Sequence, residues 1–301
     1  MRRMQIVAPL CLLLLFVPIY LWQVQGFRFS GGDETPPRPV DPIVEKPWNP
    51  LDTNDFERGS LAGALVSQAA HVDPIALLAQ TAPVELLREC LLKYRESAHS
   101  YTCTLVMQER IKGKLKPPET IEAWFKEEPF STFMHWKQGE GLASASLYVS
   151  DEHGGKMCIR PSGAAKVLGW VKRAPDSSEA KDSSRYPITE FGLRCGTERT
   201  YKAWKALQEK GVKLQVQYLG LHKNVPETGG RDCHVIRRLC NPPEEDGITE
   251  VTLLIDAETW FQVGSILKAK DDLVGYYYFK DIKLNQSLEA GRFKTDMLKK
   301  Y

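Results

Sequence analysis

The sequence has almost no excess of charge of either sign. Its 40 lysines and arginines stand against 38 aspartates and glutamates, which gives a formal net charge of +2. The basic residues are interspersed with the acidic ones and form no block. A nucleic-acid-binding surface needs a concentrated basic patch, so the sequence argues against this class of function.

The sequence also lacks the common short signatures of catalysis and of metal binding. It has no His-Glu-x-x-His, no Gly-x-Ser-x-Gly, no glycine-rich loop ending in Lys-Ser or Lys-Thr, and no Cys-x-x-Cys. His99, His135 and His222 have no second ligand at metal spacing. We therefore expect a protein that is not an enzyme and that needs neither a metal nor a cofactor.

One adjacent pair, Cys233 and His234, is the best remaining candidate for a nucleophile and its base. Both fall in an expected strand, where neighbouring side chains point to opposite faces, so the pair is not expected to act together. An unrecognised hydrolase stays as a third alternative, and it would need a convergent polar cluster in a cleft.

A long apolar run occurs at the N-terminus, where Arg2 and Arg3 precede an almost uninterrupted run from Ile6 to Trp22. This layout predicts an export signal and places the remainder of the chain in the periplasm or cell envelope. The run is longer than a usual signal core and is interrupted by proline. Residues 1–26 are therefore expected to be either a cleaved signal peptide or an anchor in the inner membrane.

The next segment, residues 27–82, begins with many prolines and few aliphatic residues, so its first part cannot bury a core. It predicts a Pro-rich tether, followed by one or two short helices broken at Asp73-Pro74. A folded domain is then expected over residues 83–301. The prolines of the tether are Pro36, Pro37, Pro39, Pro42, Pro47 and Pro50.

Six cysteines follow the N-terminal segment, and an even number outside the cytoplasm permits disulfides. Six thiols allow fifteen complete pairings, and the spacing does not choose among them. Buried free thiols are the other interpretation, because cysteine also serves as a small apolar core residue. The six are Cys90, Cys103, Cys158, Cys195, Cys233 and Cys240.

Within residues 83–301 the periodicity predicts a helix from Pro83 to about His99 and another over about 197–210. Runs with a period of two predict ten strands. Their grouping around the two helices excludes a regular parallel α/β fold and favours α+β, with one large curved antiparallel sheet wrapped around helices. The expected strands are 101–111, 120–128, 130–137, 145–151, 156–160, 212–219, 231–239, 249–255, 261–270 and 273–284.

Five stretches of the expected domain match the pattern of one known family. They are 101–110 with Gly113, Pro129-Phe130-Ser131, Pro187-Ile188-Thr189 with Gly192-Leu193, Ile255–Thr259, and Tyr278–Asn285. Through these stretches, residues 83–301 resemble the domain-of-unknown-function family 1571, which is found chiefly in planctomycete bacteria. That family is similar in architecture to the LolA-like periplasmic lipoprotein carriers. The resemblance implies a half-open antiparallel barrel around helices, with a lipid-sized apolar cavity and no assigned catalytic residues. Trp260-Phe261 departs from the family's usual turn.

Aromatic and soft apolar residues on the strands are the candidates for such a cavity. One interpretation is a fully packed core, and the other is a cavity between sheet and helices that binds a lipid or acylated ligand. We expect a non-catalytic carrier, with an envelope scaffold or protein-interaction domain as the alternative. The candidates are Leu105, Met107, Phe125, Met134, Trp136, Trp260, Tyr276 and Tyr278.

Overall fold

The computed structural model describes residues 73–139, 141–288 and 291–301. The expected export segment and nearly all of the expected tether lie outside the described residues. Within those ranges, no helix combines the length and the apolar character that a membrane span requires.

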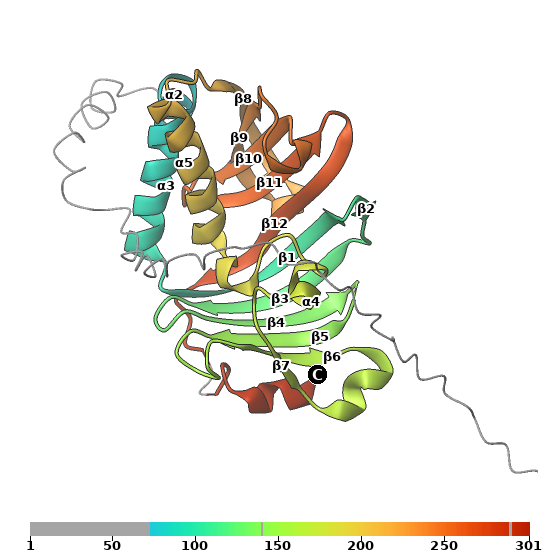
Figure 1. Ribbon diagram of the computed structural model, residues 1–301. Helices are drawn as coiled ribbons and strands as arrows, with labels where there is room; N and C mark the ends of the chain where they lie inside the picture. Colours follow the sequence, from blue (N-terminus) through green and yellow to red (C-terminus); the bar gives the residue numbers. More distant parts are fainter. Residues whose placement is uncertain (1–72, 140, 289–290) are drawn as a thin grey trace, which may run out of the picture. The chain divides into compact units, whose positions relative to one another are not determined.

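The described residues form α-helices, short 3-10 helices and one antiparallel sheet (Figure 1). The α-helices are α2 (Pro74–Thr81), α3 (Pro83–Ser97), α4 (Ser178–Lys181) and α5 (Leu193–Glu209). The 3-10 helices are η2 (Gly163–Leu168), η3 (Ile188–Glu190), η4 (Pro226–Thr228), η5 (Glu245–Gly247) and η6 (Thr295–Lys300).

Two meanders joined by their first and last strands make up the sheet. Its order is β7-β6-β5-β4-β3-β1-β12-β11-β10-β9-β8, with β2 paired to β1. The first meander comprises β1 (Ser100–Ile111), β2 (Lys114–Leu115), β3 (Glu119–Lys126), β4 (Ser131–Gln138), β5 (Ala143–Val149), β6 (Met157–Pro161) and β7 (Val171–Arg173). The second comprises β8 (Gln215–Val225), β9 (Arg231–Leu239), β10 (Glu250–Asp256), β11 (Gln262–Ala269) and β12 (Asp272–Leu284).

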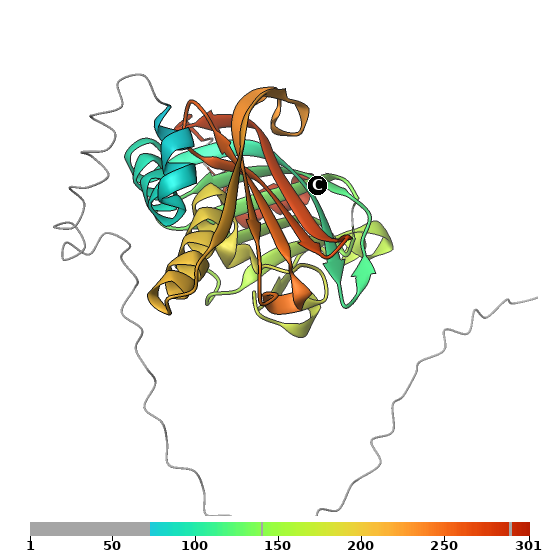
Figure 2. The same cartoon turned by 90° about the horizontal axis from the view of Figure 1, so that it is seen from above.

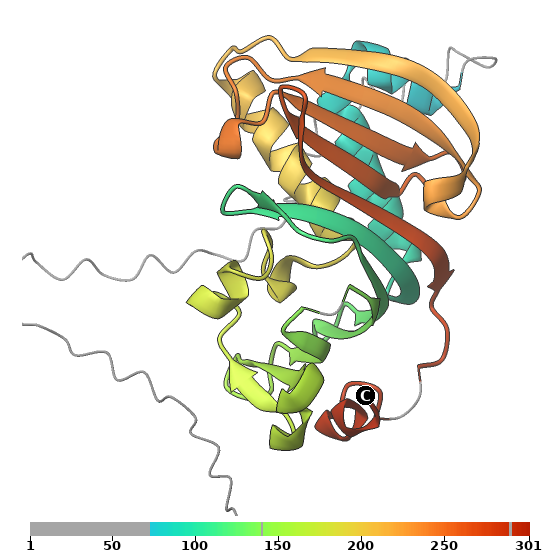
Figure 3. The ribbon, with the colours of Figure 1, turned by 90° about the vertical axis from the view of Figure 1, so that its right-hand side faces the viewer.

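The predicted α+β fold with one large curved antiparallel sheet is confirmed (Figure 3). All ten predicted strands are present, with ends that differ by up to six residues, the largest difference being at the end of β8. Strands β2 and β7 were not predicted, because strands of two or three residues are too short to show a period. Helix α5 begins at Leu193, earlier than the predicted start near Thr197.

Strand β1 lies at the centre of the sheet and sets which side chains face inward. Its burial alternates along its length, as a period of two requires. We call the face that bears Leu105, Met107 and Glu109 the inner face, and the opposite one the outer face. Met107 lies directly opposite Glu119 of β3 and Tyr277 of β12, so these three share the inner face.

Helices α2, α3 and α5 cover the inner face of the second meander (Figures 1 and 2). Leu78 of α2, Leu87 of α3 and Trp204 of α5 are buried in one cluster with strand residues such as Ile236 and Leu253. Burial of each such side chain is worth about 1.5–3 kcal/mol. This layer begins upstream of Pro83, because α2 is part of it.

The outer face of β4, β5 and β6 is covered by the end of the chain (Figure 3). Met297 and Leu298 of η6 are buried against Phe133, Leu147 and Cys158. On the inner face, Met134 of β4 belongs to a buried cluster that also contains Leu193 at the start of α5. The end of the chain therefore closes the first meander from outside, and its inner face meets only the start of α5 and the segment before it among the described residues.

Candidate functional site

An apolar cavity of about 480 Å³ lies against the inner face of the sheet. We call it the apolar cavity. This volume falls in the range typical of ligand-binding pockets. Strands of both meanders line it, and the segment between β6 and the first turns of α5 supplies the remaining wall. Its apolar lining includes Leu105, Met107, Ile121, Met134, Trp136, Ile159, Leu253, Phe279 and Phe191.

The start of α5 is positioned over the sheet by one tyrosine. The backbone N–H of Leu193 donates to the hydroxyl of Tyr101 at 3.0 Å, which satisfies one of the free donors of the first helical turn. Gly192 has a φ of +122°, and a Cβ there would lie 2.6 Å from that hydroxyl oxygen. Glycine is therefore required where the chain enters α5.

Four of the eight predicted cavity residues line the apolar cavity, namely Leu105, Met107, Met134 and Trp136. They come from β1 and β4, and strand pairing through β3 brings them onto one face. Leu105 lies opposite Ile121, and Ile121 lies opposite Trp136, so a row of apolar side chains crosses the inner face.

The other four predicted residues lie outside the apolar cavity. Phe125 is on the inner face but is fully buried, with its ring stacked on Tyr101 at a centroid distance of 4.8 Å. Trp260 sits at a positive φ of 64° in the β10–β11 turn and packs against the helix-covered core. The turn still closes, because the N–H of Trp260 donates to Asp256 O at 2.9 Å.

Tyr276 and Tyr278 lie on the outer face, where their rings stack at a centroid distance of 5.2 Å. Their neighbours Tyr277 and Phe279 line the apolar cavity instead. The predicted cavity residues Tyr276 and Tyr278 are therefore the outward-facing members of this run. Three consecutive tyrosines carry no polar residue that would show which face is buried, whereas pairing of β12 with β1 fixes it.

A polar strip interrupts the apolar lining and contains two buried carboxyl groups. Tyr277 Oη donates to Glu109 Oε1 at 2.7 Å, and the N–H of Arg185 donates to Glu109 Oε2 at 3.2 Å. Trp136 Nε1 donates to Glu119 Oε2 at 2.7 Å. Burial, with a smaller contribution from nearby Glu109, raises the pKa of Glu119. These contacts hold the aromatic rings of the wall in fixed orientations.

Two further polar side chains in the wall have atoms without a partner among the described residues. These atoms are Ser146 Oγ and Gln262 Oε1, and both residues are buried. A buried polar atom with no hydrogen bond costs free energy, which a ligand or water in the cavity would recover. Neither residue could be predicted from the sequence, because isolated polar residues in strands are common.

The six cysteines are free thiols in this structure, and five of them are buried. Cys195 on α5 is partly exposed. Burial raises the pKa of Cys195, Cys233 and Cys240 to about 11, and it also raises the pKa of Cys90, Cys103 and Cys158. Buried thiols with raised pKa values are poor nucleophiles at neutral pH.

Cys233 and His234 point to opposite sides of β9. The Cys233 sulfur lies 3.7 Å from the Thr228 hydroxyl, whereas His234 contacts Tyr218 Oη at 2.8 Å and Asp73 Oδ2 at 3.2 Å. Burial lowers the pKa of His234, and the negative charge of Asp73 offsets part of this decrease. In the described part of the chain, no group of three or more His, Cys, Asp or Glu side chains is placed to hold a metal ion.

Comparison with known proteins gives a family match over residues 98–299, described as "Protein of unknown function (DUF1571)". No curated protein matches the chain.

Similar solved structures include three bacterial proteins with low identity. A DUF1329 family protein from Desulfovibrio piger has 12% identity and a TM-score of 0.30, over 72% of this chain and 100% of that one. An uncharacterized conserved protein from Thermus thermophilus has 10% identity and a TM-score of 0.40, over 69% and 91%. The Mycobacterium tuberculosis lipoprotein LppX has 12% identity and a TM-score of 0.40, over 69% and 99%. Likenesses this distant carry no argument about what the chain binds.

Proposed function

We propose that this chain, which belongs to the DUF1571 family of proteins of unknown function, is a non-catalytic carrier that holds the alkyl chain of a lipid or acylated ligand. The observation that supports the proposal is the apolar cavity on the inner face of the sheet. Its walls are mainly aliphatic and aromatic, and it is large enough for a ligand rather than for a single water.

Area burial alone can account for such binding. Each methylene group transferred from water to an apolar wall contributes about 0.8 kcal/mol, so a long alkyl chain needs no specific motif. Trp136 and Tyr277 offer flat aromatic surfaces on either side of Leu105 and Met107, and their polar atoms are satisfied by carboxyl groups. The cavity therefore presents rings and methyl groups to a ligand.

The rim of the cavity offers a route for an apolar ligand. Leu142 and Leu168 line the cavity and are 73% and 69% exposed, and neighbouring Val167 is 88% exposed. Because two of these side chains also line the mouth of the cavity, their exposure supports a contact with a membrane or a partner there. We infer that the carrier works in the periplasm or cell envelope, to which the N-terminal segment delivers or anchors it.

The same rim also favours the second candidate function, an envelope scaffold that binds a protein partner through Leu142, Val167 and Leu168. A scaffold has no need of the cavity behind that rim. Crosslinking in intact cells separates the two functions, because a scaffold yields a defined protein adduct at the rim and a carrier yields a lipid adduct in the cavity.

Uptake of a fluorescent fatty acyl probe by the delipidated full-length protein tests the carrier directly. We expect saturable binding that unlabelled hexadecanol displaces. Absence of any saturable uptake would contradict the proposal and leave the scaffold as the better account.

A further inference from the structure

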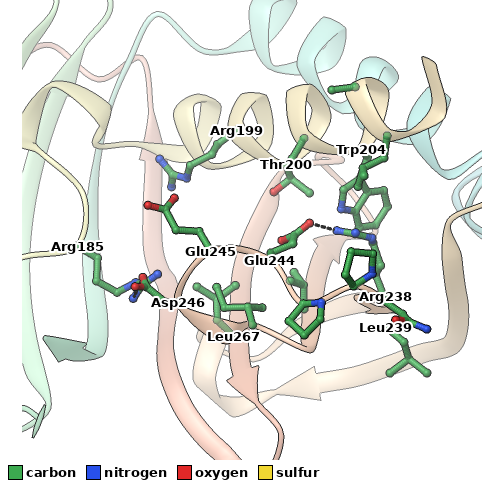
Figure 4. Close-up of a pocket in the computed structure, with 18 of the residues that line it drawn as sticks. Arg185, Arg199, Thr200, Trp204, Arg238, Leu239, Glu244, Glu245, Asp246 and Leu267 are labelled. Atoms are coloured by element: carbon green, nitrogen blue, oxygen red, sulfur yellow. Dashed lines mark hydrogen bonds and ion pairs between the residues drawn. The ribbon is translucent and has the colours of Figure 1, made fainter. Parts of the chain in front are cut away.

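A second pocket, of about 740 Å³, lies beside α5 and the loop between β9 and β10. We call it the basic pocket (Figure 4). Eight of its lining residues are lysine or arginine, and three are acidic. In Figure 4, Arg199 projects from α5, Arg238 lies beside Trp204, and Arg185 approaches from the opposite wall.

The basic pocket and the apolar cavity lie next to each other and share lining residues. Tyr186, Arg199, Thr200, Val251 and Leu267 line both. Arg199 stacks on the Tyr186 ring, with its guanidinium carbon 3.6 Å from the ring centroid, and pairs with Glu190 at 2.8 Å. A positive charge is therefore held at the junction between the apolar wall and the polar one.

Two arginines of the basic pocket, Arg185 and Arg238, have a buried Nε atom that lacks a hydrogen-bond acceptor among the described residues. The Arg238 side chain is 5% exposed and pairs with Glu244, and the Arg185 side chain is 11% exposed and pairs with Asp246 at 2.8 Å. A buried donor without an acceptor is costly, so an acceptor belonging to a ligand would stabilise both.

The lysines of the basic pocket also favour an anionic ligand. Lys181, Lys210 and Lys213 line the pocket and have no ion pair in the part of the chain that the structure describes, whereas the lining carboxylates Glu244 and Asp246 are engaged by arginines. The uncompensated charge of the pocket is positive. Planar guanidinium groups match the oxygens of phosphate and carboxylate groups.

We propose that the basic pocket binds the anionic head group, phosphate or carboxylate, of an amphiphile whose alkyl chain lies in the apolar cavity. This inference rests on the proposed carrier function and names its ligand class. Arg199 lies at the junction of the two compartments and contacts the head group where the chain passes from one to the other.

The test compares two probes with the same chain, hexadecyl phosphate and hexadecanol, on the delipidated full-length protein at concentrations below micelle formation. We expect hexadecyl phosphate to bind about tenfold more tightly, which corresponds to roughly 1.4 kcal/mol. In the Arg199→Gln variant we expect the ratio of the two affinities to fall to about one, because the charge that distinguishes the two head groups is removed. Arg95→Gln, at an exposed position on α3, serves as the matched control and keeps the advantage.

A second variant covers the case in which Arg199→Gln fails to fold. The double substitution Lys210→Gln and Lys213→Gln changes two exposed side chains just after α5. It is expected to leave the circular dichroism spectrum unchanged and to reduce the preference for hexadecyl phosphate at least threefold, because two nearby charges are removed.

The outcomes distinguish this inference from the proposed function. Equal affinity for the two amphiphiles would overturn the head-group assignment and leave the carrier intact. Displacement of hexadecyl phosphate by inorganic phosphate at equal concentration would show a free-anion site and would also overturn it. If neither amphiphile binds, the carrier function fails and the inference fails with it.

Discussion

Tyr277 of β12 donates its hydroxyl to Glu109 of β1, with the two oxygens 2.7 Å apart, in the wall of the apolar cavity. Burial raises the pKa of the Tyr277 hydroxyl, so it remains a donor at neutral pH. The contact fixes the aromatic ring that separates the helix-covered core from the cavity, and it crosses the seam between the two meanders.

Removal of this hydroxyl is expected to destabilise the fold. In Tyr277→Phe, Glu109 loses a donor inside the protein and keeps only the N–H of Arg185, so the free energy of unfolding falls by about 1–3 kcal/mol. Urea denaturation measures the change. Tyr276→Phe, on the outer face of the same strand, is the control and should stay within about 0.5 kcal/mol of the wild type. Equal losses in the two variants would contradict the assigned orientation.

The buried Glu119 carboxyl predicts a pH dependence of stability. Burial raises the pKa of Glu119 in the folded state. The unfolded chain releases this proton near the ordinary glutamate pKa of about 4.3, whereas the folded protein still holds it at that pH. The wild type therefore loses stability relative to Glu119→Gln as pH rises through the window above that value. The amide oxygen in the variant still accepts from Trp136.

Urea unfolding of both proteins, at about pH 4 and at about pH 8, measures this difference. We expect the free energy of unfolding of Glu119→Gln, relative to that of the wild type, to be higher at pH 8 than at pH 4. Glu122→Gln is the control on the same strand, because the Glu122 side chain is 42% exposed, against 9% for Glu119. Glu122 lies 3.6 Å from Lys137 and 3.4 Å from His135. A difference between wild type and Glu119→Gln that stays constant with pH would exclude the raised pKa.

Filling the cavity is expected to block the ligand without unfolding the protein. Met107→Trp adds an indole to the inner face and should weaken binding of hexadecanol at least about tenfold, with a stability change of roughly 1–3 kcal/mol. Val106→Trp places the same ring on the outer face, opposite Tyr278, and should leave the affinity unchanged. Wild-type affinity in Met107→Trp would show that ligands bind elsewhere.

The free thiols of the structure predict a specific alkylation pattern. Alkylation of denatured, unreduced protein followed by peptide mapping should find the six cysteines from Cys90 to Cys240 modified. In the native protein Cys195 should react first, because it is the partly exposed one. Recovery of a cross-linked pair of peptides would favour the disulfide interpretation instead.

Periodicity and turn chemistry were sufficient to predict the strands and the class of the fold. Residues 101–111 alternate so regularly that their buried face could be assigned from the sequence, and Leu105 and Met107 do line the cavity. The break at Asp73-Pro74 also begins a helix, where Asp73 Oδ1 accepts from the N–H groups of Ile75 and Ala76.

Features that depend on contacts distant in sequence could not be predicted. The choice of Tyr277 over Tyr276 and Tyr278 is made by the pairing of β12 with β1, more than 160 positions earlier in the chain. The basic pocket was missed for a similar reason. Its arginines come from β1, from the segment before η3, from α5 and from β9, and they gather only when the second meander folds against α5.

The most direct test of the carrier account is native mass spectrometry of the full-length protein, purified from the cells that produce it, before and after organic extraction. The account predicts an added mass that extraction removes, and that fragments into an alkyl chain bearing an anionic group. A bare polypeptide mass under conditions that preserve the fold would contradict the carrier and direct the search to protein partners.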